Sequence, residues 1–208
     1  MVQYRLATNE NGRFPAQLQD AITAYNYFLN DLKIPARNIV ISGDSVGGHI
    51  VICLLRYLAD HGAAAGLPEP RAALIWSGAV DLVAGSKPES IRANANYGVD
   101  YSDASFMSWG AKRFLSNDAR ATPYMNFLGN AFATKVPIWA YVGEKEFFHQ
   151  ELTQFIGEMK QMPGNDAHIT VEKDAPHDIF FTANIMGWTK QAEAAVDKAR
   201  EWVRSIDV

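Results

Sequence analysis

Apolar residues along the chain follow two spacings, and their alternation predicts a sheet covered by helices. Short β-branched or wholly apolar runs predict strands, and residues that recur every three or four positions predict helices. The predicted strands are Val2–Leu6, Asn38–Ile41, Arg71–Trp76, Pro137–Val142 and Ile169–Glu172. The predicted helices begin at Pro15, Ser45, Phe147 and Thr189 and end near residues 31, 61, 162 and 206. Alternating strands and helices predict an α/β fold: a mostly parallel sheet with helices on both faces.

The alternation breaks between about residues 81 and 133. Gly, Ser, Asn and Asp are frequent there, and the longest helical pattern is Ala104–Leu115. Long excursions of this kind usually form lids, binding loops or interaction surfaces. We therefore expect a single domain over residues 1–208 with an insertion at about 81–133 that acts as a lid or lines a pocket. Residues 174–187 are expected to form a loop with an apolar middle.

The strongest chemical signal lies where the Asn38–Ile41 strand meets the next helix. Residues 43–47 read Gly-Asp-Ser-Val-Gly, which has the G-x-S-x-G form of a nucleophile elbow. A turn this sharp forces the serine into a strained backbone conformation. Gly43 and Gly47 are expected where the strand and the helix pass closely. The pattern predicts Ser45 as a nucleophile. The alternative is a glycine-rich turn in which the serine has no catalytic role.

A serine hydroxyl needs a general base that is itself oriented by a carboxylate. Ligands of parallel sheets bind beyond the carboxyl ends of the strands, and His177 alone among the histidines directly follows such an end. The other four lie elsewhere: His49 one turn into the elbow helix, His61 at its far end, His149 at a helix start, and His168 at the wrong end of the last strand. His177 is therefore the predicted base, although a solvated loop histidine is the ordinary reading of such a residue.

The orienting acid is expected between Ser45 and His177, because elbow hydrolases run serine, acid, histidine along the chain. Glu144 and Glu146 both follow the Pro137–Val142 strand. We favour Glu146, because the two phenylalanines that follow it would shield it from water and strengthen its attraction for the imidazole. Glu144 remains the competing candidate.

Composition narrows the classes of function. The 208 residues carry a net charge of −4 with no basic patch, which argues against nucleic acid as a partner. Apolar residues make up 48% of the chain, enough for a sizeable core. No apolar run reaches the roughly 18 residues of a membrane span, and no secretory signal opens the chain. We therefore expect a cytoplasmic protein. We also expect no metal and no dinucleotide cofactor, since neither zinc-ligand spacing nor a G-x-G-x-x-G motif is present.

These motifs together resemble one family. The resembling segments are Tyr4-Arg5-Leu6-Ala7, Phe14-Pro15-Ala16, Asp20, Gly43–Gly48, Trp76-Ser77, Val80-Asp81-Leu82, Gly143–Glu146 and Pro176-His177. They are similar to the hormone-sensitive-lipase-like esterases of the α/β-hydrolase fold, with Val46 in place of an alanine and Glu146 where Asp is commoner. The resemblance implies hydrolysis of carboxylic esters of small to medium acyl chains by a Ser-His-Glu triad through an acyl-enzyme, with the Val46 backbone N–H as an oxyanion donor.

One departure from the family bears on activity. Its members carry a His-Gly-Gly-Gly segment upstream of the Tyr-Arg-Leu-Ala strand, and this sequence, which starts at Met1, has none. We therefore expect an N-terminally truncated fold, with Val2–Leu6 either left unpaired or paired directly with Asn38–Ile41. Loss of one oxyanion donor typically costs about 10²–10³ in kcat.

Three functions follow from these observations. The first is an esterase that acts on small-molecule esters. The second is a truncated, catalytically weak or silent remnant that acts as a binding or interaction module. The third keeps the triad but cleaves an amide, lactone or arylformamide. An unpaired strand edge also predicts a homodimer formed by strand pairing.

Overall fold

A four-stranded parallel sheet forms the centre of the computed structural model, which describes residues 1–206. The strands are β1 (Val40–Asp44), β2 (Ala72–Trp76), β3 (Ile138–Gly143) and β4 (Ala167–Glu172). They lie in the order β1-β2-β3-β4, and each neighbouring pair is parallel. Four of the five predicted strands are thus confirmed, although β4 begins two residues earlier than the apolar pattern indicates.

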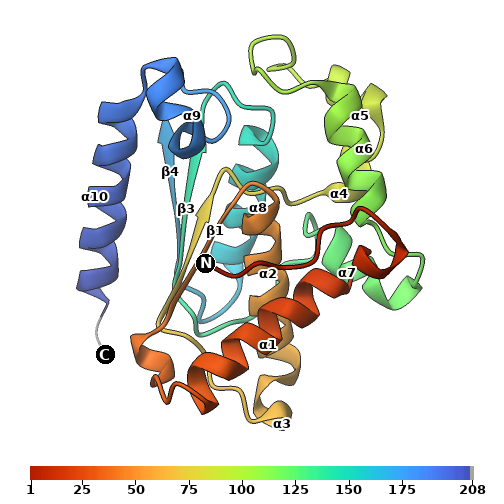
Figure 1. Cartoon of the computed structure of the whole chain (residues 1–208). Helices are drawn as coiled ribbons and strands as arrows, with labels where there is room; N and C mark the ends of the chain where they lie inside the picture. Colours follow the sequence, from red (N-terminus) through yellow and green to blue (C-terminus); the bar gives the residue numbers. More distant parts are fainter. Residues whose placement is uncertain (207–208) are drawn as a thin grey trace.

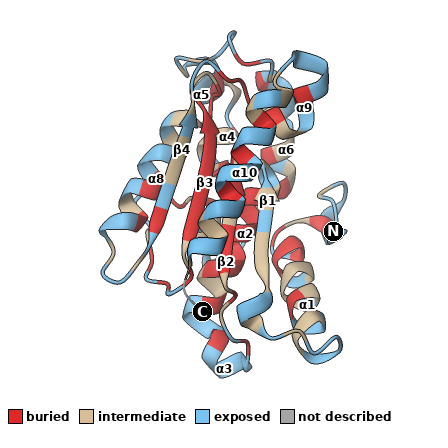
Figure 2. Cartoon of the chain, turned by 90° about the vertical axis from the view of Figure 1, so that its left-hand side faces the viewer, coloured by how far each residue is buried: buried red, intermediate tan, exposed pale blue. Residues whose placement is uncertain are grey.

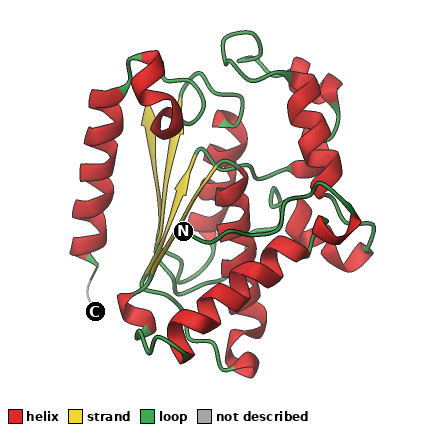
Figure 3. Ribbon diagram, in the orientation of Figure 1, coloured by secondary structure: helices red, strands yellow, loops and turns green. Residues whose placement is uncertain are grey.

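Helices cover both faces of the sheet, as predicted (Figure 3). The helices are α1 (Ala16–Asn30), α2 (Val46–Tyr57), α3 (Ala63–Ala65), α4 (Leu82–Gly85), α5 (Pro88–Arg92), α6 (Ala104–Phe114), α7 (Thr122–Met125), α8 (His149–Gln161), α9 (Ile179–Met186) and α10 (Thr189–Ser205). Helices α9 and α10 lie on one side of the sheet, and α2 and α8 lie on the other (Figure 1). Helix α9 occupies the apolar middle of the predicted 174–187 loop.

Strand β3 shows why both faces must be covered. All six of its residues are buried, and successive side chains point to opposite faces. Trp139 and Tyr141 pack with alanines and Ile179 of α9 and α10. The alternate residues Ile138, Ala140 and Val142 join the larger core beneath α2 and α8. The apolar run is therefore a strand that is buried on both faces, as expected for the middle of a parallel sheet.

Strand β1 has a different environment, because it forms an edge of the sheet. None of its five residues is fully buried, and Ser42 and Asp44 are exposed (Figure 2). The backbone N–H of Ser45 donates to the Trp76 carbonyl of β2 at 2.9 Å. Since backbone groups alternate in direction along a strand, those of Val40, Ser42 and Asp44 point away from β2. Within residues 1–206, no other strand pairs with this edge.

The prediction of a strand at Val2–Leu6 is wrong. The segment is extended but pairs with no strand of the described chain. Its backbone is held instead by side chains of α1: the N–H of Arg5 donates to Asp20 at 2.7 Å, and the Arg5 carbonyl accepts from Gln17 at 3.0 Å. An Arg5–Asp20 ion pair of 2.8 Å reinforces this attachment. The segment lines the groove along β1 but is attached to α1 and does not pair with the β1 edge.

Four short helices, α4 to α7, occupy the excursion between residues 81 and 133. Helices α4, α5 and α6 pack together at the right of Figure 1, at a distance from the sheet. Across the described part of the chain, no helix is both long and apolar enough to cross a membrane.

Candidate active site

The turn from β1 to α2 has the geometry that the elbow motif predicts. Ser45 has φ 51° and ψ −118°, a conformation that L-residues rarely adopt. A Cβ on Gly43 would collide with the carbonyl group of Gly47, so strand and helix do pass closely there. The prediction for Gly47 itself needs correction, because a Cβ at that position would meet only Asp44 Oδ1 at 3.8 Å. The second tight position is Gly48, where a Cβ would lie 2.9 Å from the Cα of Gly78.

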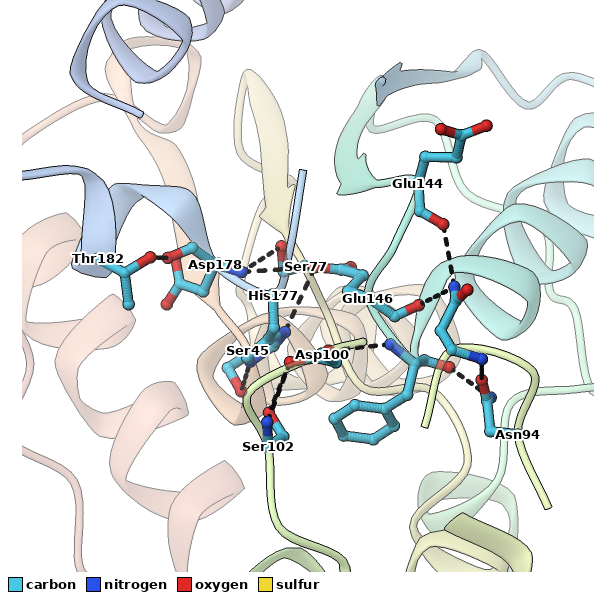
Figure 4. A network of polar contacts seen from close by, with 12 residues as sticks. Ser45, Ser77, Asn94, Asp100, Ser102, Glu144, Glu146, His177, Asp178 and Thr182 are labelled. Atoms are coloured by element: carbon cyan, nitrogen blue, oxygen red, sulfur yellow. Dashed lines mark hydrogen bonds and ion pairs between the residues drawn. The ribbon is translucent and has the colours of Figure 1, made fainter. Parts of the chain in front are cut away.

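The structure brings the three predicted catalytic side chains together. His177 Nε2 lies 3.0 Å from Ser45 Oγ, within hydrogen-bond distance. On the other side of the ring, His177 Nδ1 lies 3.4 Å from Glu146 Oε2. Figure 4 shows the row of side chains, which come from the ends of β1, β3 and β4. His177 is 6% exposed and Glu146 is fully buried, so water screens their attraction only weakly.

The charge around His177 favours its protonated form. Burial alone lowers the pKa of an imidazole, but Glu146, Asp100 and Asp178 outweigh it and hold the pKa of His177 above its ordinary value. The ring of Phe148 meets the His177 ring edge-on, with centroids 5.2 Å apart. The phenylalanine after the acid therefore shields the pair, as the sequence predicts. A base of this kind accepts a proton readily once it is in the neutral state.

Glu144 lies outside this row. Its carboxylate is exposed to solvent and accepts the backbone N–H of Asp174 at 3.1 Å. This hydrogen bond, together with Lys145, holds the pKa of Glu144 below its ordinary value. Of the two competing carboxylates, the geometry places only Glu146 beside His177.

The remaining histidines do not reach Ser45. His49 is fully buried, and its two ring nitrogens lie 3.0 Å and 2.8 Å from the carbonyl oxygens of Ala79 and Tyr124. Burial lowers the pKa of His49 to about 4, so it is neutral at pH 7. Through the Tyr124 carbonyl it connects α2 to the excursion. His168 is exposed and lies 2.6 Å from Asp166, at the start of β4.

Two positioning features were not predicted from the sequence. A Cβ on Gly143, at the end of β3, would collide with the carbonyl of Ala175 and lie 2.7 Å from that of Pro176. The absence of a side chain at this glycine lets the acid loop (Gly143–Phe148) and the segment before His177 lie against each other. Ser77, with φ 47°, accepts the backbone N–H of Asp178 at 3.2 Å through its Oγ. The end of β2 is thereby tied to the residue after His177.

A second carboxylate is buried next to the base. Asp178 follows His177 directly and has φ 45°, a left-handed conformation. Burial raises its pKa to about 6; His177 opposes this shift and nearby Asp44 adds to it. Its Oδ1 has no hydrogen-bond partner among the described residues.

Two cavities adjoin the elbow, one lined by Val46 and the other by Gly43, Asp44 and Gly47. The first, of about 420 Å³, lies between the elbow and the excursion, and its lining includes Val46, Leu82, Ile91, Phe106, Met107 and Phe148. The second is an open groove of about 910 Å³ along β1, whose lining includes Phe28, Val40, Ser42, Asp44, Asp178 and Phe180. No acceptor in the described chain binds the backbone N–H of Val46, the first residue of α2. Within the same residues, no three His, Cys, Asp or Glu side chains converge as metal ligands would.

Comparison with known proteins identifies the fold family. Residues 1–181 match the family described as having the alpha/beta hydrolase fold. An acetyl-hydrolase of Streptomyces hygroscopicus is 28% identical over 138 residues, which cover 66% of this chain and 44% of that protein.

Solved structures support the same fold. An esterase from the bacterial hormone-sensitive lipase family superposes with a TM-score of 0.77 at 24% identity, covering 93% of this chain and 61% of its own. A hyperthermophilic esterase from Pyrobaculum calidifontis gives a TM-score of 0.76 at 20% identity, covering 98% and 64%. The chain thus spans less than two thirds of the length of each of these relatives. The fold predicted from the sequence is confirmed.

Proposed function

The chain belongs to the α/β hydrolase fold family, and from that premise we propose that it is a serine hydrolase that cleaves carboxylic esters through an acyl-enzyme. The observation that carries the proposal is the row Ser45, His177, Glu146, with 3.0 Å between nucleophile and base. A strained serine at a helix N-terminus, a shielded imidazole and a buried carboxylate match the parts that acyl transfer needs.

The reaction proceeds in two halves. His177 Nε2 removes the hydroxyl proton while Ser45 Oγ bonds to the acyl carbon, and the carbonyl π electrons move onto oxygen. The tetrahedral intermediate then collapses: the C–O bond to the alcohol breaks, and the alcohol leaves with the proton from His177. Water repeats these steps on the acyl-Ser45 ester and releases the carboxylic acid. Glu146 holds the ring orientation and stabilises the imidazolium that forms in each half.

The backbone N–H of Val46 supports the proposal as an oxyanion donor. It opens α2, where the helix dipole favours negative charge, and it has no acceptor of its own in the described chain. A donor aimed at the developing oxyanion contributes about 3–4 kcal/mol to lowering the barrier.

The cavity of about 420 Å³ supports a preference for uncharged acyl groups of small to medium size. Its lining is largely apolar, and we infer that the insertion at about 81–133 supplies most of it through Leu82, Ile91, Phe106 and Met107. Binding sites of this size usually bury most of a small ligand. Acetate, butyrate and hexanoate esters of p-nitrophenol are the substrates to compare first.

Labelling with a fluorophosphonate probe tests the nucleophile. We expect covalent labelling of the parent chain and none of the Ser45→Ala variant, together with hydrolysis of p-nitrophenyl butyrate by the parent alone. A Ser205→Ala variant is the control, since Ser205 is exposed at the end of α10 and its hydroxyl donates to the Trp202 carbonyl, away from Ser45. Labelling that persists in Ser45→Ala would sink the assignment. Assays with an amide, a lactone and an arylformamide decide whether the same row of residues serves another acyl substrate.

A second function is favoured by the groove along β1. The groove of about 910 Å³ reaches Asp44 beside the nucleophile, and the edge that it follows has no strand partner in residues 1–206. A binding or interaction module would use this edge and show neither labelling nor turnover above the Ser45→Ala control. The predicted homodimer would also form here. It stays a prediction, and light scattering at high protein concentration measures it.

A further inference from the structure

The loop between α5 and α6 grips the backbone of the acid loop with three side chains. Asn94 Nδ2 donates to the Phe147 carbonyl at 2.8 Å. Asn96 Nδ2 donates to the carbonyls of Glu144 and Glu146, both at 2.9 Å. Asp100 Oδ2 accepts the backbone N–H of Phe147 at 3.0 Å. Four backbone groups of the acid loop are therefore held from the excursion, as Figure 4 shows for Asn94 and Asp100.

Two of these contacts enclose the proposed triad acid. Asn96 holds the carbonyl of Glu146, and Asp100 holds the next N–H along the chain. The two contacts hold the peptide group between Glu146 and Phe147, so they restrict the ψ angle of Glu146. Asp100 is itself fixed, because its other oxygen accepts the N–H and the hydroxyl of Ser102, each at 3.1 Å. It is 7% exposed, so its contact with the acid loop is largely shielded from water.

The distance between His177 and Glu146 is slightly longer than that of an ordinary hydrogen bond. His177 Nδ1 and Glu146 Oε2 are 3.4 Å apart, beyond the usual 2.7–3.2 Å of an N–H···O bond. Neither His177 Nδ1 nor the other Glu146 oxygen has a hydrogen bond within the described chain. A shift of the acid loop by a few tenths of an ångström would therefore complete the contact or abolish it. Catalytic rates are sensitive to displacements of this size.

We propose that Asn96 and Asp100 are positioning residues that set the Glu146 carboxylate against His177. The proposal rests on the proposed function, since it assigns a role in the same row of residues. These two side chains touch neither the nucleophile nor the reacting carbon; they act through the backbone on either side of Glu146. The excursion therefore has a part in proton transfer as well as in shaping the apolar cavity.

The cavity of about 420 Å³ adjoins the gripping loop. Ile91 of α5 and Phe106 of α6 line the cavity, and the gripping loop joins these two helices. Phe147 also lines it, and both of its backbone groups are held by Asn94 and Asp100. The apolar cavity and the contacts that hold the acid loop therefore meet at Phe147.

Substitutions of Asp100 and Asn96 differ in whether they change the charge near His177. The charged groups facing His177 are Glu146, Asp178 and Asp100, and Asp44 lies beyond Asp178. An Asp100→Asn change keeps an oxygen that can accept the Phe147 N–H but removes one negative charge, so the pKa of His177 falls. An Asn96→Ala change removes no charge, and lowers the pKa of His177 only if Glu146 moves away.

The test measures turnover and the His177 titration in parallel. For Asn96→Ala we expect kcat for p-nitrophenyl butyrate to fall by about 10- to 100-fold, with KM changed less than about twofold because the cavity lining is intact. The acid limb of the kcat/KM profile should move to lower pH in both Asn96→Ala and Asp100→Asn. The same shift should appear in an NMR titration of ¹⁵N-labelled His177, which needs no turnover.

Matched controls separate positioning from stability. Asn165→Ala loses the same kind of contact, since Asn165 Nδ2 donates to two backbone carbonyls, of Phe132 and Met159, far from the site. It should lower stability without moving kcat or the His177 titration. Asp103→Asn removes an exposed carboxylate from the same loop and should change neither. An unshifted His177 titration and unchanged kcat in folded Asn96→Ala would overturn the proposal. A parent chain that neither labels nor turns over would overturn the proposed function, while the NMR titration would still decide the positioning role.

Discussion

Ser45 has two contrasting sides. Toward β3 and β4, Glu146 is fully buried, His177 is nearly so, and phenylalanine rings exclude water from the pair. Toward the free edge of β1, an open groove of about 910 Å³ runs past Ser42 and Asp44, and outward backbone groups have no strand partner in the described residues. The comparison shows that the side holding His177 and Glu146 is enclosed by the described residues, whereas the other side is open. Contacts of β2, β3 and the excursion with the His177 segment and the acid loop set the geometry of the enclosed side.

The largest expected effect comes from breaking the closed side directly. Glu146→Gln keeps the size of the side chain but removes the charge that stabilises the imidazolium, so kcat should fall by about 10³–10⁴-fold. Glu144→Gln is the matched control two residues away, and its exposed carboxylate should be replaceable with less than about a twofold change. Equal losses in the two variants, measured with p-nitrophenyl butyrate, would reverse the choice of acid.

A smaller loss is expected when the two loops are pushed apart. In Gly143→Ala, the new methyl group collides with the Ala175 carbonyl, so the His177 segment must shift and kcat should fall by about 10²-fold. The control is Gly157→Ala in α8, where a Cβ meets nothing within 4 Å and removal of a helical glycine should stabilise the fold by about 0.5–1 kcal/mol. Thermal unfolding separates the two effects. Full activity in Gly143→Ala would show that the close approach is dispensable.

The open side is best examined without any substitution. Amide hydrogen exchange should be faster for Val40, Ser42 and Asp44, which point into the groove, than for Ile41 and Gly43, which face β2. We expect at least about a tenfold difference in rate within the same strand, since only the second set is hydrogen-bonded. Uniform protection along β1 would mean that the edge is covered in solution, by a second copy or by the N-terminal segment.

The smallest expected effect is on the pH dependence of stability, and it comes from the buried carboxyl group of Asp178. The pKa of Asp178 rises to about 6 on folding, from an ordinary value of 3.8, so the folded state binds more protons between these values. Stability should therefore fall as the pH rises through that window. Asp178→Asn removes this dependence and suits the left-handed backbone at the site. Its Tm should be less sensitive than the parent's to a change from pH 5 to pH 8. A Tm difference between the parent and Asp178→Asn that is the same at pH 5 and pH 8 would contradict the assignment, since other buried groups such as His49 contribute equally to both chains.

The parts of the site that the sequence predicts are those carried by local patterns. Ser45 has a five-residue motif, and His177 and Glu146 each follow an apolar strand whose carboxyl end must lie at the same edge of the sheet. Val2–Leu6 was mispredicted because β-forming residues specify a strand only when a neighbour is available to pair with. Whether such a neighbour is present depends on the tertiary structure, which no local sequence pattern specifies.

The positioning residues were missed for a related reason. Asn96 and Asp100 contact residues about 50 positions away, and in the sequence they look like ordinary turn-forming residues of a polar excursion. Gly143 belongs to the Gly143–Glu146 resemblance, but its crowding could not be predicted, because the carbonyl that excludes a side chain there belongs to Ala175. Conversely, Gly47 belongs to the motif but has room for a methyl group. A motif records which residues recur together, and only the fold shows which of them are crowded.

The hydrogen bond between Ser45 and His177 joins residues 132 positions apart. Elements with short-range contacts form early in folding, and contacts of such long range form late. During refolding, helical circular dichroism should therefore recover before Ser45 becomes reactive toward a fluorophosphonate. During synthesis on the ribosome Ser45 emerges long before His177, so on the proposed mechanism we expect the nascent chain to stay unreactive toward the probe until the segment after β4 has docked.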